Sequence, residues 1–348
     1  MELRLADRII ADSRPTLIVA EIGVNHDGSL SRAMELVDAA AESGADAVKL
    51  QIFRAETLLH ASGAFAGYQR QRCADATPAD MLRRYELSPE HLHRIIYAIR
   101  ARGLLPLATP FSPADVALIE RLDLPAVKIA SPDLVNLPLL GRAARTGLPL
   151  LLSTGAATME EVAATYATLV GWGVAFALLH CVSSYPTPDE QANLAWIGEL
   201  RRRFDVPIGY SDHTTHEAAG ALAVAAGACI VEKHLTYDRN AAGPDHASSA
   251  DPEQFARYVK AIRQAERLKG AGPKRVLDIE RDVRLVGRQS LVTARALAAG
   301  EMIREEDLTV QRPGTGISAA ALAQVVGRSA VRDLPARTLL QWEMLSRP

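Results

Sequence analysis

The chain has 348 residues, enough for one large and one small domain or for two medium domains, each with its own buried core. Hydrophobic residues make up 48% and charged residues 23%, which is typical of a folded globular protein and excludes a largely disordered chain. The formal net charge of -2 gives no general attraction to nucleic acid, so we expect no nucleic-acid partner and only local anion-binding sites.

The three cysteines, Cys73, Cys181 and Cys229, are odd in number and lack the C-x-x-C spacing of thiolate zinc sites. They indicate neither a disulfide framework nor a structural zinc, and they fit a reducing compartment. The amino-terminal segment is charged throughout, and no apolar run approaches the length of a signal-peptide core or a membrane span. We therefore expect a cytoplasmic protein with no membrane partner.

Short apolar segments rich in β-branched residues alternate with longer amphipathic segments, as in parallel α/β folds. Eight short segments qualify as strands: 17–24, 47–52, 105–110, 126–131, 148–154, 174–181, 206–212 and 229–234. Helix-like segments lie between or after them: 31–42, 89–102, 113–121, 137–146, 159–171, 189–204, 215–226 and 252–268. Because no G-x-G-x-x-G loop follows the first strand, a (β/α)8 TIM barrel is favoured over a doubly wound open sheet.

A segment containing glycine and proline at 270–274 marks a change to short strands and turns, including 289–292 and 308–311. We predict a barrel domain at residues 1–272, a linker at 273–284 and a small second domain at 285–348. A domain of that size is marginally stable by itself, so we expect it to pack on the barrel or on another subunit.

Each predicted strand ends in polar or reactive side chains. In a TIM barrel the strand ends gather at the carboxyl-terminal face, where the active sites of this fold are built. The side chains are those of Glu21, Lys49, Gln51, Thr109, Lys128, Ser131, Ser153, Thr154, His180, Ser211 to His213 and Glu232 to His234. The pattern predicts one polar site at this face.

Two lysines stand at equivalent places, Lys49 in A-V-K-L-Q and Lys128 in A-V-K-I-A-S, where an unpaired ammonium group would be costly to bury. A surface ion pair is the structural alternative. With the hydroxyls of Ser131, Ser153 and Ser211, the two ammonium groups suit a phosphate and a carboxylate together, as in phosphoenolpyruvate. One such lysine could instead be the nucleophile of a Schiff-base aldolase.

Two histidines, His213 and His234, end the seventh and eighth predicted strands, which are neighbours in a barrel. They could bring two imidazoles to one divalent cation and leave positions open for water and substrate. Two histidines packed in the core are the alternative.

Three carboxylates lie close to these groups in the predicted barrel. Glu21 ends the first strand, and Asp133 follows Lys128 in the loop after the fourth strand, so each could act as a general acid or base. Glu21 could also form an ion pair with Lys49 or Lys128. Asp245 lies on a polar, glycine-containing loop after the last strand, which could fold over the barrel mouth.

Several segments resemble the N-acetylneuraminate (sialic acid) synthases and their legionaminate and pseudaminate relatives. They are A-E-I-G-V-N-H-D-G (20–28), A-D-A-V-K-L-Q (45–51), A-T-P-F (108–111), V-K-I-A-S (127–131), L-S-T-G (152–155), H-C-V-S-S-Y-P-T-P (180–188), G-Y-S-D-H-T (209–214), E-K-H-L-T (232–236) and G-P-D-H-A-S (243–248). Their order and spacing cover essentially the whole barrel. The carboxyl-terminal segment, with R-P-G-T-G-I at 312–317, resembles the antifreeze-like (SAF) domain of the same family.

The resemblance implies a reaction and a set of roles. Phosphoenolpyruvate would condense with an N-acylated amino sugar and water to give a nine-carbon 2-keto sugar acid and phosphate. N-acetylmannosamine is the first choice of sugar, and a 2,4-diacetamido-2,4,6-trideoxyhexose is the alternative. Phosphoenolpyruvate would bind to Lys49, Lys128, Ser131, Ser153 and Ser211.

The resemblance also implies that His213 and His234 hold Mn2+ or Mg2+ and that Glu21 and Asp133 take part in catalysis with them. The sugar site would include Gln51, Thr109, Phe111, Tyr185 and Asp245. Arg312 would reach the N-acyl group from the second domain of another subunit, in a domain-swapped homodimer.

One segment departs from the family pattern. The family has a glutamate in K-I-x-S-x-E, whereas this chain has K-I-A-S-P-D, so Asp133 has a shorter reach and Pro132 stiffens its approach. The change leaves a noncatalytic sugar-binding protein as an alternative. A 3-deoxy-octulosonate-phosphate type of synthase is also related in chemistry, but the second domain argues against it.

Overall fold

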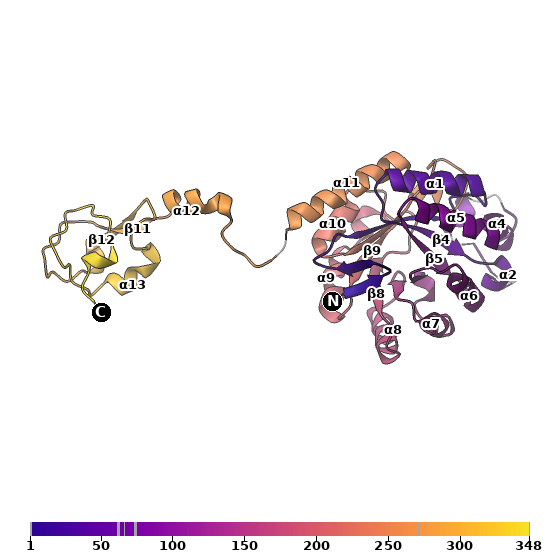
Figure 1. Ribbon diagram of the computed structural model, residues 1–348, viewed down its shortest axis with the longest axis horizontal. Helices are drawn as coiled ribbons and strands as arrows, with labels where there is room; N and C mark the ends of the chain where they lie inside the picture. The colour runs from indigo at the N-terminus through magenta and orange to yellow at the C-terminus, as the bar shows by residue number, and fades with distance from the viewer. Residues whose placement is uncertain (1, 61–62, 66, 73–74, 271, 348) are drawn as a thin grey trace. The chain divides into compact units, whose positions relative to one another are not determined.

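The computed structural model describes residues 2–60, 63–65, 67–72, 75–270 and 272–347. The chain divides into two compact units, Met1–Ala271 and Gly272–Pro348 (Figure 1). The division falls within the glycine- and proline-containing segment at which the sequence pattern changes.

The first unit is a barrel of eight parallel strands in the order β5-β4-β3-β10-β9-β8-β7-β6, and the end strands β5 and β6 contact one another. This is the predicted TIM-barrel architecture. All eight predicted strands are present, most of them shorter by one or more residues. They are β3 (Leu17–Gly23), β4 (Ala47–Ile52), β5 (Leu105–Pro110), β6 (Val127–Ile129), β7 (Leu150–Ser153), β8 (Phe176–Cys181), β9 (Ile208–Asp212) and β10 (Ile230–His234).

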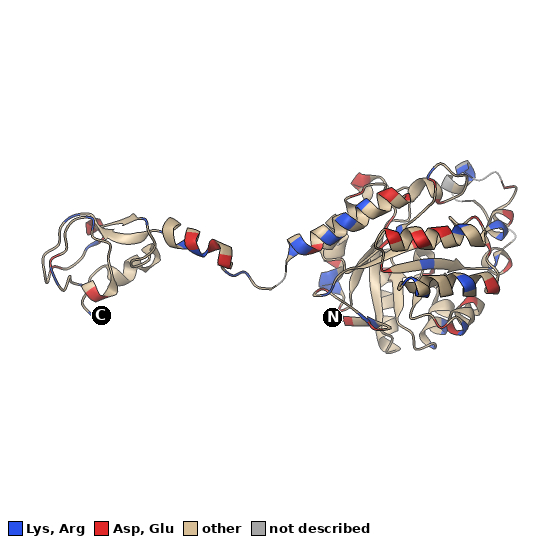
Figure 2. Cartoon of the chain, turned by 45° about the horizontal axis from the view of Figure 1, so that its top comes forward, with Lys and Arg blue, Asp and Glu red and all other residues tan. Residues whose placement is uncertain are grey.

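Helices cover the outside of the barrel (Figure 1). They are α1 (Leu30–Glu42), α5 (Pro89–Ala101), α6 (Pro113–Arg121), α7 (Leu137–Ala144), α8 (Met159–Gly171), α9 (Ala195–Arg203), α10 (Ala219–Ala226) and α11 (Pro252–Lys269). Ser88 and Ser112 cap α5 and α6, and Thr158 forms a capping box with Glu161 at α8. Charges of both signs lie along the outer helices, whereas most of the strand surface is uncharged (Figure 2). Among the described residues, no helix has the length and apolar character needed to span a membrane.

Strand alternation gives the barrel two apolar layers and aims the site residues. Ile18, Ala20 and Ile22 of β3 face the helices, whereas Leu17 and Val19 face the barrel interior. The next inward position on β3 is Glu21. The interior is therefore apolar near the strand starts and polar near the strand ends.

Several elements were not predicted. The hairpin of β1 (Glu2–Leu5) and β2 (Arg8–Ala11) packs Leu3, Leu5 and Ile10 against the interior residues near the strand starts and so closes that end of the barrel. Three short helices, α2 (Ala55–Leu58), α3 (Gly67–Arg72) and α4 (Pro78–Tyr85), lie between β4 and α5. Their polar or short segments lack the long amphipathic period that identified the other helices.

The second unit contains α12 (Arg281–Gly287), the antiparallel pair β11 (Ser290–Thr293) and β12 (Leu308–Gln311), and α13 (Leu322–Val325). Its own small core includes Leu291, Ile303, Ile317, Leu334 and Leu340. Helix α12 overlaps the last residues of the segment 273–284, which was predicted as a linker. Cys181 and Cys229 are buried free thiols of the first unit, and Cys73 lies outside the described residues.

His26 lies in the loop that leads from β3 to α1 and is 1% exposed. Its Nδ1 accepts a hydrogen bond from the backbone N–H of Gly28 at 3.0 Å, so the ring must stay unprotonated at that nitrogen. Burial lowers the pKa of His26 to about 4, although the neighbouring Asp27 favours the charged form.

We expect the free energy of unfolding of the protein to fall in acid because His26 is buried in this loop. Since the folded-state pKa of His26 lies below the ordinary value, the unfolded chain takes up the proton first, and stability is lost as the pH falls from about 6.5 to about 4. The loss should be on the order of 3 kcal/mol. The free energy of unfolding of the wild type and of His26→Gln, measured between pH 4 and 7, should converge in acid; parallel curves would contradict the assignment.

Candidate active site

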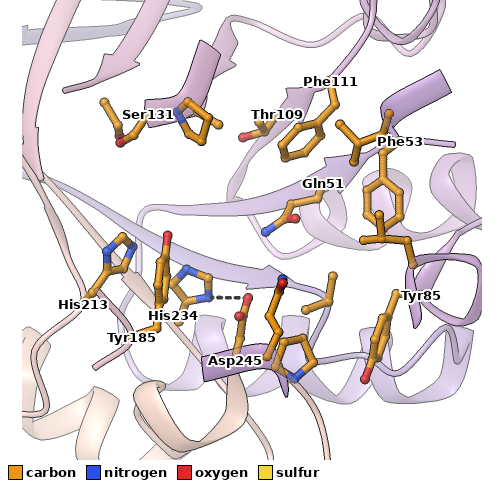
Figure 3. Close-up of a pocket in the computed structure, with 18 of the residues that line it drawn as sticks. Gln51, Phe53, Tyr85, Thr109, Phe111, Ser131, Tyr185, His213, His234 and Asp245 are labelled. Atoms are coloured by element: carbon orange, nitrogen blue, oxygen red, sulfur yellow. Dashed lines mark ion pairs between the residues drawn. The ribbon is translucent and has the colours of Figure 1, made fainter. Parts of the chain in front are cut away.

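A cavity of about 350 Å3 opens at the carboxyl ends of the barrel strands (Figure 3), a size that suits small metabolites. Most of the predicted site residues line it, and they come from seven of the eight strands or from the loops that follow them. These residues are Lys49, Gln51, Thr109, Phe111, Lys128, Ser131, Ser153, Tyr185, Ser211, His213, His234 and Asp245.

Lys49 lines this cavity and forms a short ion pair with Glu21, which does not line it. Glu21 is fully buried, and its Oε1 accepts a hydrogen bond from Gln51 Nε2 at 3.0 Å. Burial raises the pKa of Glu21 although Lys49 opposes the shift, because Glu232 adds a second negative charge nearby. Burial disfavours the charged form of Lys49, but the two carboxylates outweigh it and raise the pKa of Lys49.

Glu232 is a cavity residue to which the sequence analysis assigned no role. Its Oε1 lies 3.7 Å from Lys49 Nζ and 3.9 Å from Lys128 Nζ, and it accepts a hydrogen bond from Ser211 Oγ at 3.1 Å. Burial opposes its charge, but Lys128 and Lys49 lower the pKa of Glu232, so this carboxylate is ionised. The sequence could have identified Glu232 as a site residue, because it stands two residues before His234 and therefore lies on the same face of β10.

Lys128 lies on the far side of Glu232 from Lys49. Its Nζ donates to Ser153 Oγ at 2.6 Å and to the carbonyl of Ile129 at 3.1 Å. Burial and the charge of Lys49 lower the pKa of Lys128 despite the nearby Glu232. Ser131 Oγ, close by, accepts from the backbone N–H of Gly155 at 3.0 Å, and its hydroxyl also interacts with the Cys181 thiol.

The imidazoles of His213 and His234 are neighbours, with ring centroids 5.5 Å apart and planes inclined by 57°, and the Tyr185 ring lies 4.1 Å from that of His213. His213 Nδ1 lies 2.9 Å from the carbonyl of Val182, which can only accept, so Nδ1 carries the proton and Nε2 is the candidate metal ligand. Burial lowers the pKa of His213, but the Cys181 sulfur and the Val182 carbonyl raise it above its ordinary value, so a cation would compete with a proton.

His234 is neutral, because burial and the charge of His213 hold its pKa well below the ordinary value. Its Nδ1 lies 3.6 Å from Asp245 Oδ2 and has no hydrogen-bond partner among the described residues (Figure 3). A neutral imidazole with an unsatisfied nitrogen fits a divalent cation. Within the described ranges, no group of three or more His, Cys, Asp or Glu side chains is arranged to hold a metal ion, and His213 and His234 are the two neighbouring imidazoles of the cavity.

The other end of the cavity is apolar (Figure 3). Phe53 and Phe111 make an edge-to-face contact with ring centroids 6.0 Å apart. Met81 and Tyr85, both on α4, pack with Phe53 to complete this wall. The wall was not predicted except for Phe111, because α4 was not identified as an element.

Two predicted catalytic residues of the first unit, Glu21 and Asp133, do not line the cavity. Glu21 lies behind Lys49. Asp133 ends a 3-10 turn, Ser131–Asp133, and its Oδ1 accepts from Asn136 Nδ2 at 2.9 Å. Arg312 is exposed and follows β12 in the second unit.

Asp245 is held in the cavity by contacts between its own loop and the loop after β3. Asn25 Nδ2 donates to the carbonyl of Leu235 at 2.9 Å and to Ser249 Oγ at 2.8 Å, and Ser249 Oγ donates in turn to the carbonyl of Asp245 at 2.8 Å. Burial raises the pKa of Asp245, although His213 and other cations favour its charge. A cation bound at His234 would lie close to this carboxyl.

The NeuB family model matches residues 36–274 of the chain, and the SAF domain model matches residues 288–346. The chain belongs to the NeuB family. N,N'-diacetyllegionaminic acid synthase of Legionella pneumophila is 39% identical over 95% of each chain. The synthase of the same name from Campylobacter jejuni is 36% identical over 92% of this chain and 97% of its own.

A solved structure supports the same relationship for this NeuB-family chain. The N-acetylneuraminic acid (sialic acid) synthetase of Leptospira borgpetersenii, in complex with citrate, superposes with a TM-score of 0.75 at 31% identity. The match covers 81% of this chain and 95% of that one. The predicted family and its SAF domain are confirmed, and the chain is a relative of sugar acid synthases.

The ion pair of Lys49 allows a stability prediction. Lys49→Met would leave Glu21 and Glu232 without their shared cation, so unfolding of the barrel in urea should require about 3 kcal/mol less than in the wild type. Lys49→Met combined with Glu21→Gln removes the uncompensated charge and should recover at least half of the loss. A single variant as stable as the wild type would show that the cluster is not charged as described.

Proposed function

We propose that this protein condenses phosphoenolpyruvate with an N-acylated amino sugar and water to form a nine-carbon 2-keto sugar acid and phosphate. The observation that supports this most is the convergence of two buried lysines and three serine hydroxyls at one end of a cavity. N-acetylmannosamine is the simplest sugar that fits the proposal.

Phosphoenolpyruvate has a phosphate and a carboxylate on adjacent positions, and both need cations. Lys49 and Lys128 each lie within 4 Å of Glu232, so their ammonium groups face a common point. A dianion that binds here would neutralise part of the positive charge of the two lysines, which Glu232 neutralises in its absence. Ser131, Ser153 and Ser211 would donate to the remaining oxygen atoms.

In the proposed reaction, C3 of phosphoenolpyruvate forms a bond with the aldehyde carbon of the open-chain sugar. Water adds at C2, and the bond between C2 and the phosphate oxygen then breaks. Lys49 and Lys128 would stabilise the phosphate as it leaves. Mn2+ or Mg2+ bound by His213 and His234 would supply Lewis acidity toward the aldehyde oxygen.

Proton transfer is assigned to the two buried carboxylates whose pKa values diverge. Glu232 is ionised and faces the cavity, so it is the candidate base for the attacking water. Glu21, with its raised pKa, can hold and return a proton next to Lys49. Asp133 is left out because its carboxylate accepts from Asn136 Nδ2 at 2.9 Å outside the cavity, whereas Glu21 contacts the cavity residue Lys49.

The sugar would extend from the histidines toward the apolar wall, with Gln51, Thr109, Tyr185 and Asp245 as polar contacts. Phe53, Met81 and Phe111 would cover a methyl group, either of an N-acyl substituent or of a 6-deoxy carbon. This wall supports a second candidate substrate, a 2,4-diacetamido-2,4,6-trideoxyhexose, as does the similarity to the two legionaminic acid synthases. A charged 6-phosphate fits it poorly.

Two other functions compete with this proposal. In a Schiff-base aldolase, Lys128 would form the imine, because burial lowers its pKa. Borohydride would then trap pyruvate on the protein, which the proposed reaction excludes. A noncatalytic sugar-binding protein would bind the sugar and metal without releasing phosphate.

The test is release of phosphate from phosphoenolpyruvate in the presence of Mn2+. N-acetylmannosamine, its 6-phosphate and 2,4-diacetamido-2,4,6-trideoxyhexoses are compared, with a chelator as control. Release that depends on one sugar and stops with chelator supports the proposal and names the sugar. No release with any of them contradicts it.

Substitution of a proposed metal ligand should abolish activity without unfolding the protein. His234→Ala should reduce Mn2+-dependent phosphate release to background and leave the circular dichroism spectrum unchanged. His216→Ala is the control, because His216 is an exposed histidine that follows β9 beyond His213, does not line the cavity, and accepts a hydrogen bond at Nδ1 from the backbone N–H of Ala218 at 3.1 Å. Full activity of His234→Ala would refute the ligand assignment.

We also propose a domain-swapped homodimer in the cytoplasm, where thiols such as Cys181 and Cys229 stay reduced. Arg312 of one subunit would bind the N-acyl oxygen of the sugar in the partner's barrel. Arg312→Ala should then raise the apparent KM of the sugar about tenfold, as expected for a lost hydrogen bond from a charged group. The KM of phosphoenolpyruvate should change little, and equal increases for both substrates would argue against this contact.

A further inference from the structure

A second pair of buried charges lies outside the barrel interior, directly behind the two histidines. Asp212 is the last residue of β9 and stands directly before His213, and Lys233 precedes His234 on β10. Because side chains alternate along a strand, Asp212 and Lys233 point away from the cavity, into the layer beneath α10 and α11. They are 1% and 4% exposed.

This layer is otherwise built from apolar side chains such as Val231, Val224 and Ile262. Ion pairs in such a layer are a poor source of stability, since well-packed hydrophobic residues of similar volume are often as stable or more so. A buried pair at this place therefore calls for a role other than stabilisation.

Asp212 has a full set of hydrogen-bond donors. Its Oδ2 accepts from Lys233 Nζ at 2.9 Å and from Tyr258 Oη at 2.7 Å, and its Oδ1 accepts from Tyr210 Oη at 3.1 Å and from the backbone N–H of Thr214 at 2.8 Å. Lys233 Nζ also donates to the carbonyl of Thr214 at 2.7 Å. The pair is thus oriented by five contacts.

These contacts hold the backbone directly after His213. Asp212 binds the N–H of Thr214 and Lys233 binds its carbonyl, so the segment 212–214 is tied to β10. Asp212 and Lys233 are also direct partners in the register of β9 and β10. The strand end that bears His213 is therefore fixed relative to the one that bears His234.

Helix α11 takes part through Tyr258, whose ring lies 5.0 Å from Lys233 Nζ. Gly220 of α10 makes room for that ring, because a Cβ there would come within 2.6 Å of the Tyr258 hydroxyl. The packing of α10 and α11 is thereby coupled to the separation of the two strand ends.

We propose that Asp212, Lys233 and Tyr258 are positioning residues that set the spacing and orientation of His213 and His234 for one divalent cation. The inference rests on the proposed function, because it requires that the two histidines bind a metal. The three residues touch neither the cavity nor a substrate, so they act through the strand ends alone.

The test uses the full-length, substrate-free protein and Mn2+, with free Mn2+ measured by electron paramagnetic resonance. Asp212→Asn combined with Lys233→Met removes both charges, so neither is left unpaired, and the fold should survive. We expect the Kd for Mn2+ to rise about tenfold, as for other residues that orient metal ligands. A folded double variant with wild-type affinity would overturn the proposal.

Tyr258→Phe is a milder variant that keeps the charges and removes only one hydrogen bond to Asp212. It should raise the Kd for Mn2+ by a smaller factor in the same direction, and an unchanged Kd would count against the part assigned to α11. Asp46→Asn is the matched control. Asp46 accepts from Arg263 at 2.6 Å and from the backbone N–H of Ile18 at 2.8 Å near the start of β3, so its loss should reduce stability without changing the Kd.

Failure of this inference can be told from failure of the proposed function. His213→Ala and His234→Ala serve in the same titration. If both bind Mn2+ like the wild type, the metal assignment itself is wrong. If both lose Mn2+ and the Asp212 and Lys233 double variant keeps it, only the positioning role is refuted.

Discussion

The cluster of Glu21, Lys49, Glu232 and Lys128 is the constraint on which the mouth of the barrel depends. Four such deeply buried charges would be costly if any one of them were unpaired. Two carboxylates and two ammonium groups compensate one another, and Gln51, Thr109, Ser153 and Ser211 each add a hydrogen bond to one of them. Because both lysines share Glu232, an arriving dianion finds two cations already ordered and desolvated.

This arrangement separates two tasks within one cavity. Residues on barrel strands, which are rigid, provide the charges and the imidazoles. Short helices between β4 and α5 provide the apolar wall, with Met81 and Tyr85 on α4.

The barrel could be predicted because its signals are local. Each strand is a short apolar segment with a polar end. Helices such as α5 and α8 begin at a capping residue that stands within three residues of the backbone N–H it binds. The hairpin of β1 and β2 was not predicted, because its apolar residues are buried only by contacts with the interior of the closed barrel. Helix α4 was missed because its buried residues, Met81 and Tyr85, lie within a segment that is otherwise polar.

The sequence by itself determined which residues meet at the carboxyl-terminal face, since the period of two along each strand decides which side chains point inward. It did not determine how the charges pair. Only the closed barrel brings Glu232 between Lys49 and Lys128, because these three stand on strands far apart in the chain. Tertiary structure also turned Asp133 away from the cavity and placed Asp212 against Lys233, since each outcome depends on neighbouring strands and helices that no local pattern describes.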